Sequence, residues 1–449
     1  MLELSYKKIL FIALPLMFGT FVQSMIGIID GAFVSSLGNT AYNAVGNGSI
    51  MYVALFMLCR GLGDGTQITI AQKFGEERHN EIGLTLFNAQ IQQLIISCFI
   101  FTLFFFFSGV IIDAIVKSKP LAASMTDFMK YRSWGIFFAS MQVTLAAFFI
   151  GIGKTRIIIV STLLLALCNI LLDFGLIYGK FGLPELGMIG APIASSIAEM
   201  VTSIFLLMVV LKGDKFKKFA YSLKLGFEKG IQKTLFLLSY PLMLQGLVSL
   251  STWLIFFTML EHLGPNDLEV AHNIRYMYFL AFIPIFGFAS ATRTYVGNLV
   301  GRNERHLIPK IQFKIITLAF FAILLIFHGA IIYPEVLIGI VEHNPDIDPA
   351  VMENSAKALR FVSGSIIFYA VAAVPYNSIS ALGKTRLAFL IECCSILLYL
   401  LGCYFFIEVW HWNIVEVWAV EYLYFGPIGI LSALYLFVNR YKLGLVVRK

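Results

Sequence analysis

The fold is decided by the stretch PLMFGTFVQSMIGIIDGAFVSSLG, which runs from Pro15 to Gly38. As a helix rising about 1.5 Å per residue, this stretch is long enough to cross a bilayer. It contains one acidic residue, Asp30. An ionised Asp deep in hydrocarbon costs about 2.5–3.5 kcal/mol even on the lower insertion scales. Asp30 is therefore expected to face a polar cavity, a partner or a cation.

The rest of the chain is similarly apolar. Of its 449 residues 59% are hydrophobic and 13% are charged, and the mean hydropathy is +0.84. Long apolar runs separated by short basic loops are typical of a polytopic helical membrane protein. The first run is too long for a signal-peptide core and holds an acid, so it is expected to stay in the mature protein. The six cysteines and seven histidines lack metal-ligand spacing, which argues against a metalloenzyme.

Twelve membrane spans are predicted, and they form an all-α membrane protein. They cover approximately residues 9–37, 47–74, 82–108, 125–150, 155–178, 186–211, 232–262, 269–298, 307–333, 353–382, 386–407 and 417–439. Most of the 33 Lys and Arg residues then fall in loops on one side, which the positive-inside rule places in the cytoplasm together with both termini. The net charge of +7 is thereby explained by membrane topology, and nucleic acid is not expected as a partner.

The second half of the sequence repeats the first. At a shift of 226 positions Pro15-Leu16-Met17 aligns with Pro241-Leu242-Met243, and at a shift of 230 Gly153-Lys154-Thr155-Arg156 aligns with Gly383-Lys384-Thr385-Arg386. Six spans per repeat give both repeats the same orientation, so two parallel six-helix bundles with a central site are predicted. The predicted parts are an N-lobe (residues 1–211), a basic cytoplasmic linker (212–231) and a C-lobe (232–449).

Two acids of the first half have no acidic counterpart in the second. Asp30 aligns with Phe256 and Asp173 with Cys403, whereas the prolines named above occur in both halves. An acid that is present in only one copy of a duplicated scaffold is better explained by function than by folding. Asp30 and Asp173 are therefore the first candidates for a functional site.

Further polar residues are expected beside these acids. Asn169 and Asp173 are four apart, and Gln23 and Asp30 are seven apart, so each pair shares a helix face. Asp30 and Asp173 would lie roughly 8–10 Å inside the outer end of their spans, and Asn169 and Ser195 roughly 14 Å. Such oxygens suit Na⁺ at Asp30, Asn169 and Asp173, or a proton shared by the two carboxyl groups. The alternative is that these groups hydrogen-bond neighbouring helices and bind nothing.

Five more residues are candidates for gating or for lining a cavity. Glu199, one turn beyond Ser195, either joins the site or faces a pore. Arg60 and Asp64, four apart, form either an intrahelical ion pair or a gate. Arg293 either snorkels to the cytoplasmic surface or contacts an anionic partner. Pro15 is expected to kink the first span, and a switching role for it is an added hypothesis.

An ordered set of motifs resembles the multidrug and toxic compound extrusion (MATE) family. The set comprises Pro15…Gln23…Asp30, Gln72-Lys-Phe-Gly75, Gly153-Lys-Thr-Arg156, Asn169-x₃-Asp173 and Gly190-Ala-Pro-Ile-Ala-Ser195. The resemblance implies two six-helix lobes that export organic solutes in exchange for Na⁺ or H⁺. It also implies that Asp30, Asn169, Asp173 and Ser195 form an N-lobe cation site, with Gln23 lining the cavity. The Asn-x₃-Asp spacing favours the DinF-like branch of the family.

The leading hypothesis is a cation-coupled antiporter of the bacterial inner membrane that acts as a monomer. It would export cationic or amphipathic solutes, with H⁺ or Na⁺ as coupling ion, no other cofactor and only membrane lipid as a further partner. The alternative is a flippase for lipid-linked oligosaccharide, for which the sequence offers few basic residues, mainly Arg60, Arg275 and Arg293. A membrane-embedded enzyme is disfavoured because the spans contain no nucleophile–base pair. The other large twelve-span superfamily is disfavoured because its Gly-x₃-Asp-Arg loop is missing.

Overall fold

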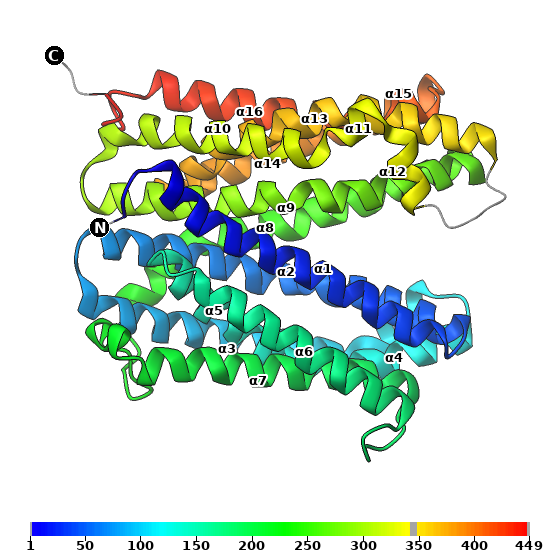
Figure 1. The fold of residues 1–449 in the computed structure, drawn as a ribbon, viewed down its shortest axis with the longest axis horizontal. Coiled ribbons are helices and arrows are strands. Elements are labelled where there is room, and N and C mark those ends of the chain that lie inside the picture. Colours follow the sequence, from blue (N-terminus) through cyan, green and yellow to red (C-terminus); the bar gives the residue numbers. More distant parts are fainter. Residues whose placement is uncertain (1, 342–347, 447–449) are drawn as a thin grey trace. The chain divides into compact units, whose positions relative to one another are not determined.

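The computed structural model describes residues 2–341 and 348–446, and this part of the chain is helical without strands. The first half contains α1 (Tyr6–Ser35), α2 (Asn39–Gly75), α3 (His79–Ile115), α4 (Lys119–Ser133), α5 (Gly135–Gly151), α6 (Arg156–Tyr178) and α7 (Gly190–Lys212). The second half contains α8 (Lys229–Leu260), α9 (Pro265–Gly301), α10 (Ile308–Phe327), α11 (Gly329–Ile332), α12 (Pro334–Val341), α13 (Pro349–Ala381), α14 (Thr385–Cys403), α15 (Ile414–Val417) and α16 (Val420–Val438). Figure 1 shows these helices along the chain.

The predicted membrane-spanning architecture is confirmed. Within the described residues, eleven helices are long and apolar enough to cross a membrane, and there are twelve if α4 and α5 count as one span. These two helices meet at Trp134 and are bent by 49°. The predicted fourth span, residues 125–150, is therefore a broken helix. Sequence periodicity did not reveal this break, because apolar residues continue on both sides of it.

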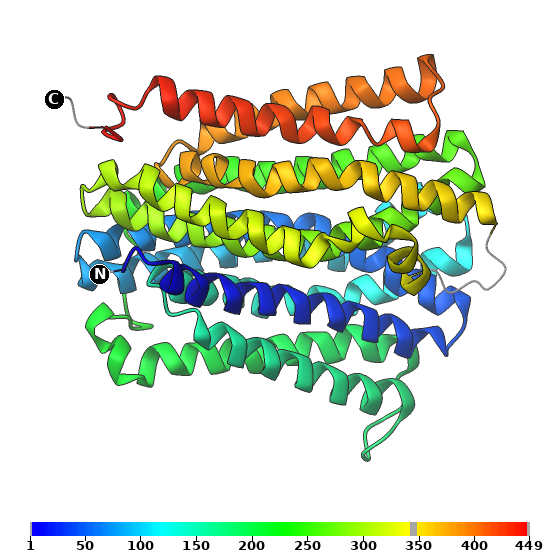
Figure 2. The ribbon, with the colours of Figure 1, turned by 45° about the horizontal axis from the view of Figure 1, so that its top comes forward.

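The chain divides into two compact units, each described here by itself. Unit 1 contains residues 1–17 and 248–449, and unit 2 contains residues 18–247. The predicted division placed residues 1–211 and 232–449 in separate lobes. The units of the structure instead change within α1, shortly after Pro15, and within α8, shortly after Pro241. In both units the long helices run side by side (Figures 1 and 2).

The first turns of α1 belong to unit 1 because they pack there. Met17 of α1 packs directly against Gly287 of α9. A Cβ added at Gly287 would lie 2.5 Å from Met17 Cγ, so a side chain at this position would collide with Met17. Just before α1, the Lys314 ammonium donates a hydrogen bond to the Leu4 carbonyl at 2.7 Å. These contacts explain why unit 1 begins with a segment from the N-terminus.

The first half of α8 packs in unit 2 in the corresponding way. Gly61 and Gly65, four apart on α2, face α8 directly: a Cβ on Gly61 would lie 2.4 Å from the Met243 backbone nitrogen, and one on Gly65 would lie 2.0 Å from Ser239 Oγ. Small residues at such spacing let two membrane helices approach backbone to backbone. Glycine is therefore required at both positions by the close contact of α2 with α8.

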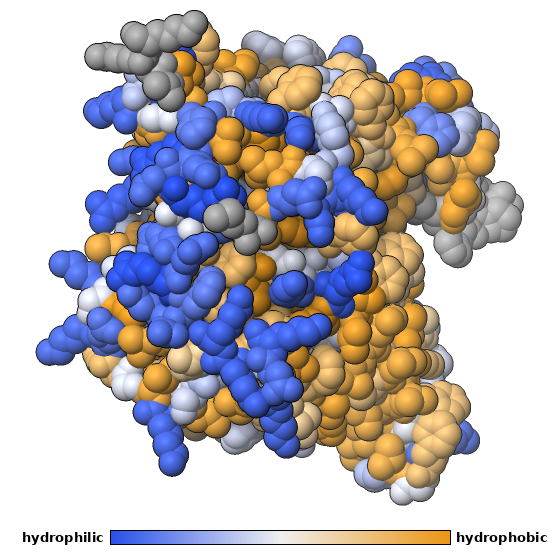
Figure 3. Space-filling view, turned by 60° about the vertical axis from the view of Figure 1, so that its left-hand side comes forward, coloured by the Kyte–Doolittle hydropathy of each residue, from blue (hydrophilic) through white to orange (hydrophobic). Residues whose placement is uncertain are grey.

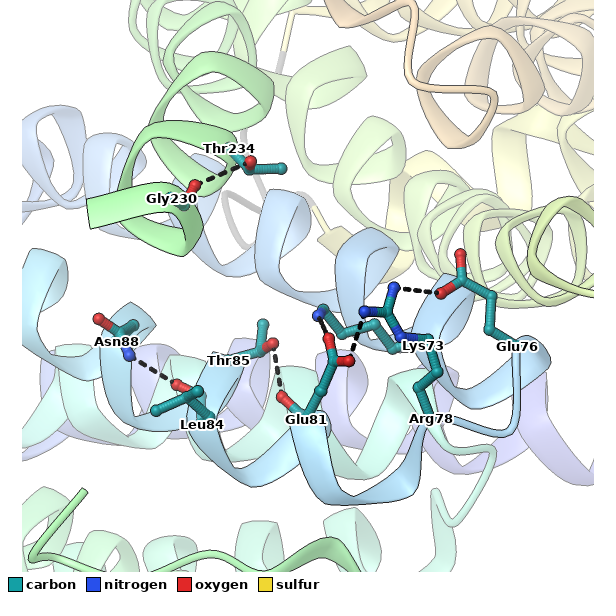
Figure 4. A network of polar contacts seen from close by, with 9 residues as sticks. All are labelled: Lys73, Glu76, Arg78, Glu81, Leu84, Thr85, Asn88, Gly230 and Thr234. Atoms are coloured by element: carbon teal, nitrogen blue, oxygen red, sulfur yellow. Dashed lines mark hydrogen bonds and ion pairs between the residues drawn. The ribbon is translucent and has the colours of Figure 1, made fainter. Parts of the chain in front are cut away.

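The turn between α2 and α3 is held by an ion-pair network (Figure 4). Glu81 accepts from both Lys73 and Arg78, and Arg78 also bonds Glu76 at 3.3 Å. The hydrogen bonds from Arg78 to Glu76 and Glu81 raise the pKa of this exposed guanidinium above its usual value. Because Arg78 is exposed and its partners Glu76 and Glu81 are partly exposed, water screens these ion pairs and their net contribution to stability is small. The network orients the turn more than it stabilises the fold.

The predicted basic linker belongs to unit 2, where it packs against α3. Phe219 is 2% exposed, and burial raises the pKa of Tyr221, whose hydroxyl donates to Gln90 at 2.6 Å, to about 12. Asn88 of α3 accepts from the backbone nitrogen of Glu228 at 3.0 Å. The linker lysines therefore extend from a backbone that is anchored to α3.

The surface is divided into polar and apolar zones in the manner expected of a membrane protein. Figure 3 shows hydrophilic side chains gathered around the helix ends that face the viewer and hydrophobic side chains along the helix flanks. Large apolar side chains such as Phe106, Val110 and Leu325 are exposed. Exposed apolar area of this extent requires a lipid environment.

Candidate cation-binding site

The structure brings together the two acids that the sequence singled out. Asp30 lies near the end of α1 and Asp173 near the end of α6, and their carboxyl groups are close enough to act on each other electrostatically. Asp173 is fully buried. Neither of its oxygens receives a hydrogen bond from an N–H or O–H group of the described residues. Two carboxyl groups in contact can bond only if one holds a proton, and otherwise require a cation between them.

Asn169 lies one turn before Asp173 on α6 and is 1% exposed. Its amide nitrogen is 3.4 Å from Ser195 Oγ on α7, at the long end of the hydrogen-bond range. Its amide oxygen has no hydrogen-bond partner among the described residues. A buried carbonyl oxygen of this kind is a suitable ligand for a hard cation. The packing of α6 against α7 thus places Asn169 and Ser195 together, as the sequence predicted.

Glu199 forms an ion pair beside these carboxyl groups. Arg132 of α4 donates through both terminal nitrogens to Glu199, with one distance of 2.8 Å, and the two side chains are 12% and 13% exposed. The Arg132 guanidinium also lies over the Tyr52 ring, 4.0 Å from its centroid. Both charges act on Asp30 electrostatically. Glu199 is thus a neighbour of the site that is held by a strong, bidentate partner.

Gly135 makes room for this ion pair. A Cβ at Gly135 would lie 2.2 Å from Arg132 Nη1 and 2.7 Å from Glu199 Oε2. The glycine follows Trp134, where α4 ends and α5 begins. The break in the fourth span therefore positions Arg132 against Glu199. Sequence reasoning missed Arg132, although an arginine inside a predicted apolar span was a signal that could have identified it.

The other predicted residues lie elsewhere. Gln23 is exposed on α1, and Pro15 is buried in the part of α1 that belongs to unit 1. Arg60 is exposed and Asp64 half-buried on α2. Arg293 lies on α9 of unit 1, where its Nη1 donates to Asn377 Oδ1 at 2.7 Å. Within unit 2 the candidate site therefore consists of the two aspartates, Asn169 and Ser195. The ion pair of Arg132 and Glu199 lies next to it.

The second half contains two buried acids of its own, at positions that do not correspond to Asp30 and Asp173. Glu392 on α14 is 3% exposed and Glu421 on α16 is 2% exposed. Tyr399 donates to Glu421 across 3.4 Å. Glu421 was missed because it stands at the predicted outer edge of its span, where an acid usually reaches water. Among the described residues, no group of three or more His, Cys, Asp or Glu side chains is suited to hold a metal ion.

Comparisons with known proteins agree with this fold. The family model MatE matches residues 15–174 and 241–405. A probable multidrug resistance protein NorM of Thermotoga maritima is 25% identical over 413 residues, which is 87% of this chain and 83% of that protein. A probable multidrug resistance protein NorM of Neisseria meningitidis serogroup B is 21% identical over 352 residues, covering 78% and 76% of the two chains.

Solved structures show the same fold. A transporter of the MOP superfamily from Pyrococcus furiosus superposes with a TM-score of 0.87 at 18% identity, covering 98% of this chain and 96% of the other. An outward-facing multidrug resistance MATE family transporter superposes with a TM-score of 0.86, also at 18% identity, covering 99% and 97%. Because the MatE model matches both halves of the duplication, this chain belongs to the MATE family of membrane transporters.

Proposed function

We propose that this protein is a cation-coupled antiporter that exports organic, cationic or amphipathic solutes across a bacterial inner membrane. The observation that carries the proposal is the proximity of two carboxyl groups on different helices of unit 2, those of the half-buried Asp30 and the fully buried Asp173. The names of the NorM relatives support efflux of several drugs as the transport activity. Both termini are expected in the cytoplasm, and one chain is expected to suffice for transport.

In the proposed mechanism, a proton or Na⁺ binds between Asp30 and Asp173. Na⁺ would also be coordinated by the amide oxygen of Asn169, which has no other hydrogen-bond partner in the part of the chain that is described. Binding neutralises charge in the buried cluster and draws α1 towards α6. A ligand can shift a conformational equilibrium only by binding one state better. The ion therefore favours the state in which α1 and α6 are close, and its release favours the other.

Transport by the purified, full-length protein in liposomes tests this proposal. A fluorescent organic cation such as ethidium is offered under a Na⁺ gradient alone and under a pH gradient alone. Uptake or release that is driven by one gradient, with counterflow of that ion, supports antiport and identifies the coupling ion. Movement of neither ethidium nor other organic cations under either gradient would contradict the proposal.

A further inference from the structure

A second buried carboxyl group, Glu392 of unit 1, is surrounded by hydroxyl groups. Its side chain accepts from Ser249 Oγ at 2.7 Å, from the Tyr376 hydroxyl at 2.9 Å and from the Tyr424 hydroxyl. These donors come from three helices, α8, α13 and α16, whereas Glu392 itself is on α14. A carboxyl group that is bonded by side chains from three other helices is a built site and not an incidental polar residue.

No basic side chain of the described residues forms an ion pair with Glu392. Tyr369 on α13 and the neighbouring Cys393 on α14 are further titratable groups beside Glu392, and the Arg293 guanidinium of α9 acts electrostatically on Tyr369. A carboxylate without a cation is costly inside a membrane. Glu199 in unit 2 is different, since Arg132 binds it through two nitrogens. Glu199 is therefore paired with a cation, whereas Glu392 is hydrogen-bonded by neutral hydroxyl groups.

The chemistry of the partners decides what each acid can do. Arg is a donor only, so in this pair Glu199 serves only as an acceptor. A hydroxyl group both donates and accepts. When Glu392 is ionised, Ser249, Tyr376 and Tyr424 donate to it. When it is protonated, its own O–H donates to one of these oxygens after that hydroxyl has rotated. The surroundings of Glu392 thus accommodate both protonation states without a movement of the helices.

The three residues that carry these hydroxyl groups differ in exposure. Tyr376 is 3% exposed, whereas Ser249 and Tyr424 are half-buried. Tyr424 and Ser249 also bond each other, at 3.4 Å. A proton would therefore reach Glu392 from the side of Ser249 and Tyr424. In the internal duplication Ser249 occupies the position of Gln23, and Glu392 the position of Thr162, so the first half has no acid at the equivalent place.

We propose that Glu392 is a second proton-binding group of the transporter, which takes up one proton as a carboxylate and releases it again in each transport cycle. This inference rests on the proposed antiport and adds a proton site in unit 1 to the carboxyl pair in unit 2. The step is a simple protonation: the proton comes from water on the acidic side, one O–H bond forms on Glu392, and no other bond is broken.

Infrared difference spectroscopy of the full-length protein tests the inference without depending on transport. Spectra in acidic and alkaline buffer are compared for the wild type, Glu392→Gln and a matched control, Glu353→Gln. Glu353 is an exposed acid of the same unit that pairs with Lys357. A buried carboxylic-acid band that appears on acidification should be reduced in Glu392→Gln and unchanged in Glu353→Gln. A folded Glu392→Gln protein with the full wild-type band would overturn the inference.

The Tyr424→Phe variant covers the case in which Glu392→Gln fails to fold. It keeps the acid and removes one donor, so the Glu392 band should remain but titrate at a different pH. An unchanged titration would count against the inference. In liposomes, Glu392→Gln should lower the number of protons exchanged per ethidium. Loss of the infrared band in Glu392→Gln, together with no gradient-driven transport by the wild type, would contradict the antiport proposal and still support the proton site.

Discussion

Phe256 packs edge-on against Tyr399, with 5.6 Å between the ring centroids. In the internal duplication these two residues occupy the positions of Asp30 and Asn169. The second half has thus kept the helix contact and replaced an acid and an amide by two aromatic rings, with Trp418 packed on Phe256 at 5.4 Å. The same scaffold forms a polar cluster in unit 2 and an apolar core in unit 1.

This asymmetry predicts the effect of removing the charge of Asp30. Asp30→Asn keeps the size of the side chain but removes a group that binds a proton or Na⁺. Gradient-driven efflux should be abolished, while the amount of protein in the membrane stays the same. The matched control is Asp113→Asn, which removes an exposed acid from α3 of the same unit. Efflux by Asp30→Asn at the wild-type rate would contradict the assignment of the coupling site.

The oxygens around the aspartates should differ in importance. Asn169→Leu removes a buried amide oxygen, and a lost hydrogen bond or ligand of this kind costs about 1 kcal/mol, which is roughly fivefold in apparent ion affinity. Ser195→Ala should have a smaller effect, because Ser195 contacts Asn169 only across 3.4 Å. The dependence of ethidium transport on the concentration of the coupling ion measures the apparent ion affinity of both variants. An equal or larger loss in Ser195→Ala would show that Ser195 is itself a ligand.

The Arg132–Glu199 pair should contribute to stability as a unit. Removing one partner of a buried ion pair costs up to about 3–5 kcal/mol because an uncompensated charge remains, and the residual exposure of both groups places the expected cost at the lower end. Arg132→Met should therefore clearly lower the unfolding temperature of the protein in detergent. The double variant Arg132→Met with Glu199→Met should recover part of this loss. A double variant that is less stable than Arg132→Met would show that the pair is not coupled.

Much of the fold and part of the site followed from the sequence. Apolar run lengths gave the spans, and helical spacing with depth placed Asp30 and Asp173 at one level, where the structure brings them close together. The partners of Glu199 and Glu392 could not be predicted. Arg132 is 67 residues from Glu199, and Ser249 is 143 residues from Glu392. Local spacing carries no information about which helices pack side by side over such separations.

The close contact of α2 with α8 gives a final prediction. Gly61→Val places a branched side chain where the Met243 backbone nitrogen lies 2.4 Å from the added Cβ. Backbone cannot move aside as a flexible side chain does, so overpacking should cost about 1–3 kcal/mol or more. Gly46→Val is the matched control, because it lies on the same helix and a Cβ there meets nothing within 4 Å. Both substitutions change helix propensity alike, so the difference between their unfolding temperatures measures the helix contact alone. Equal unfolding temperatures would show that the two helices are not in direct backbone contact at Gly61.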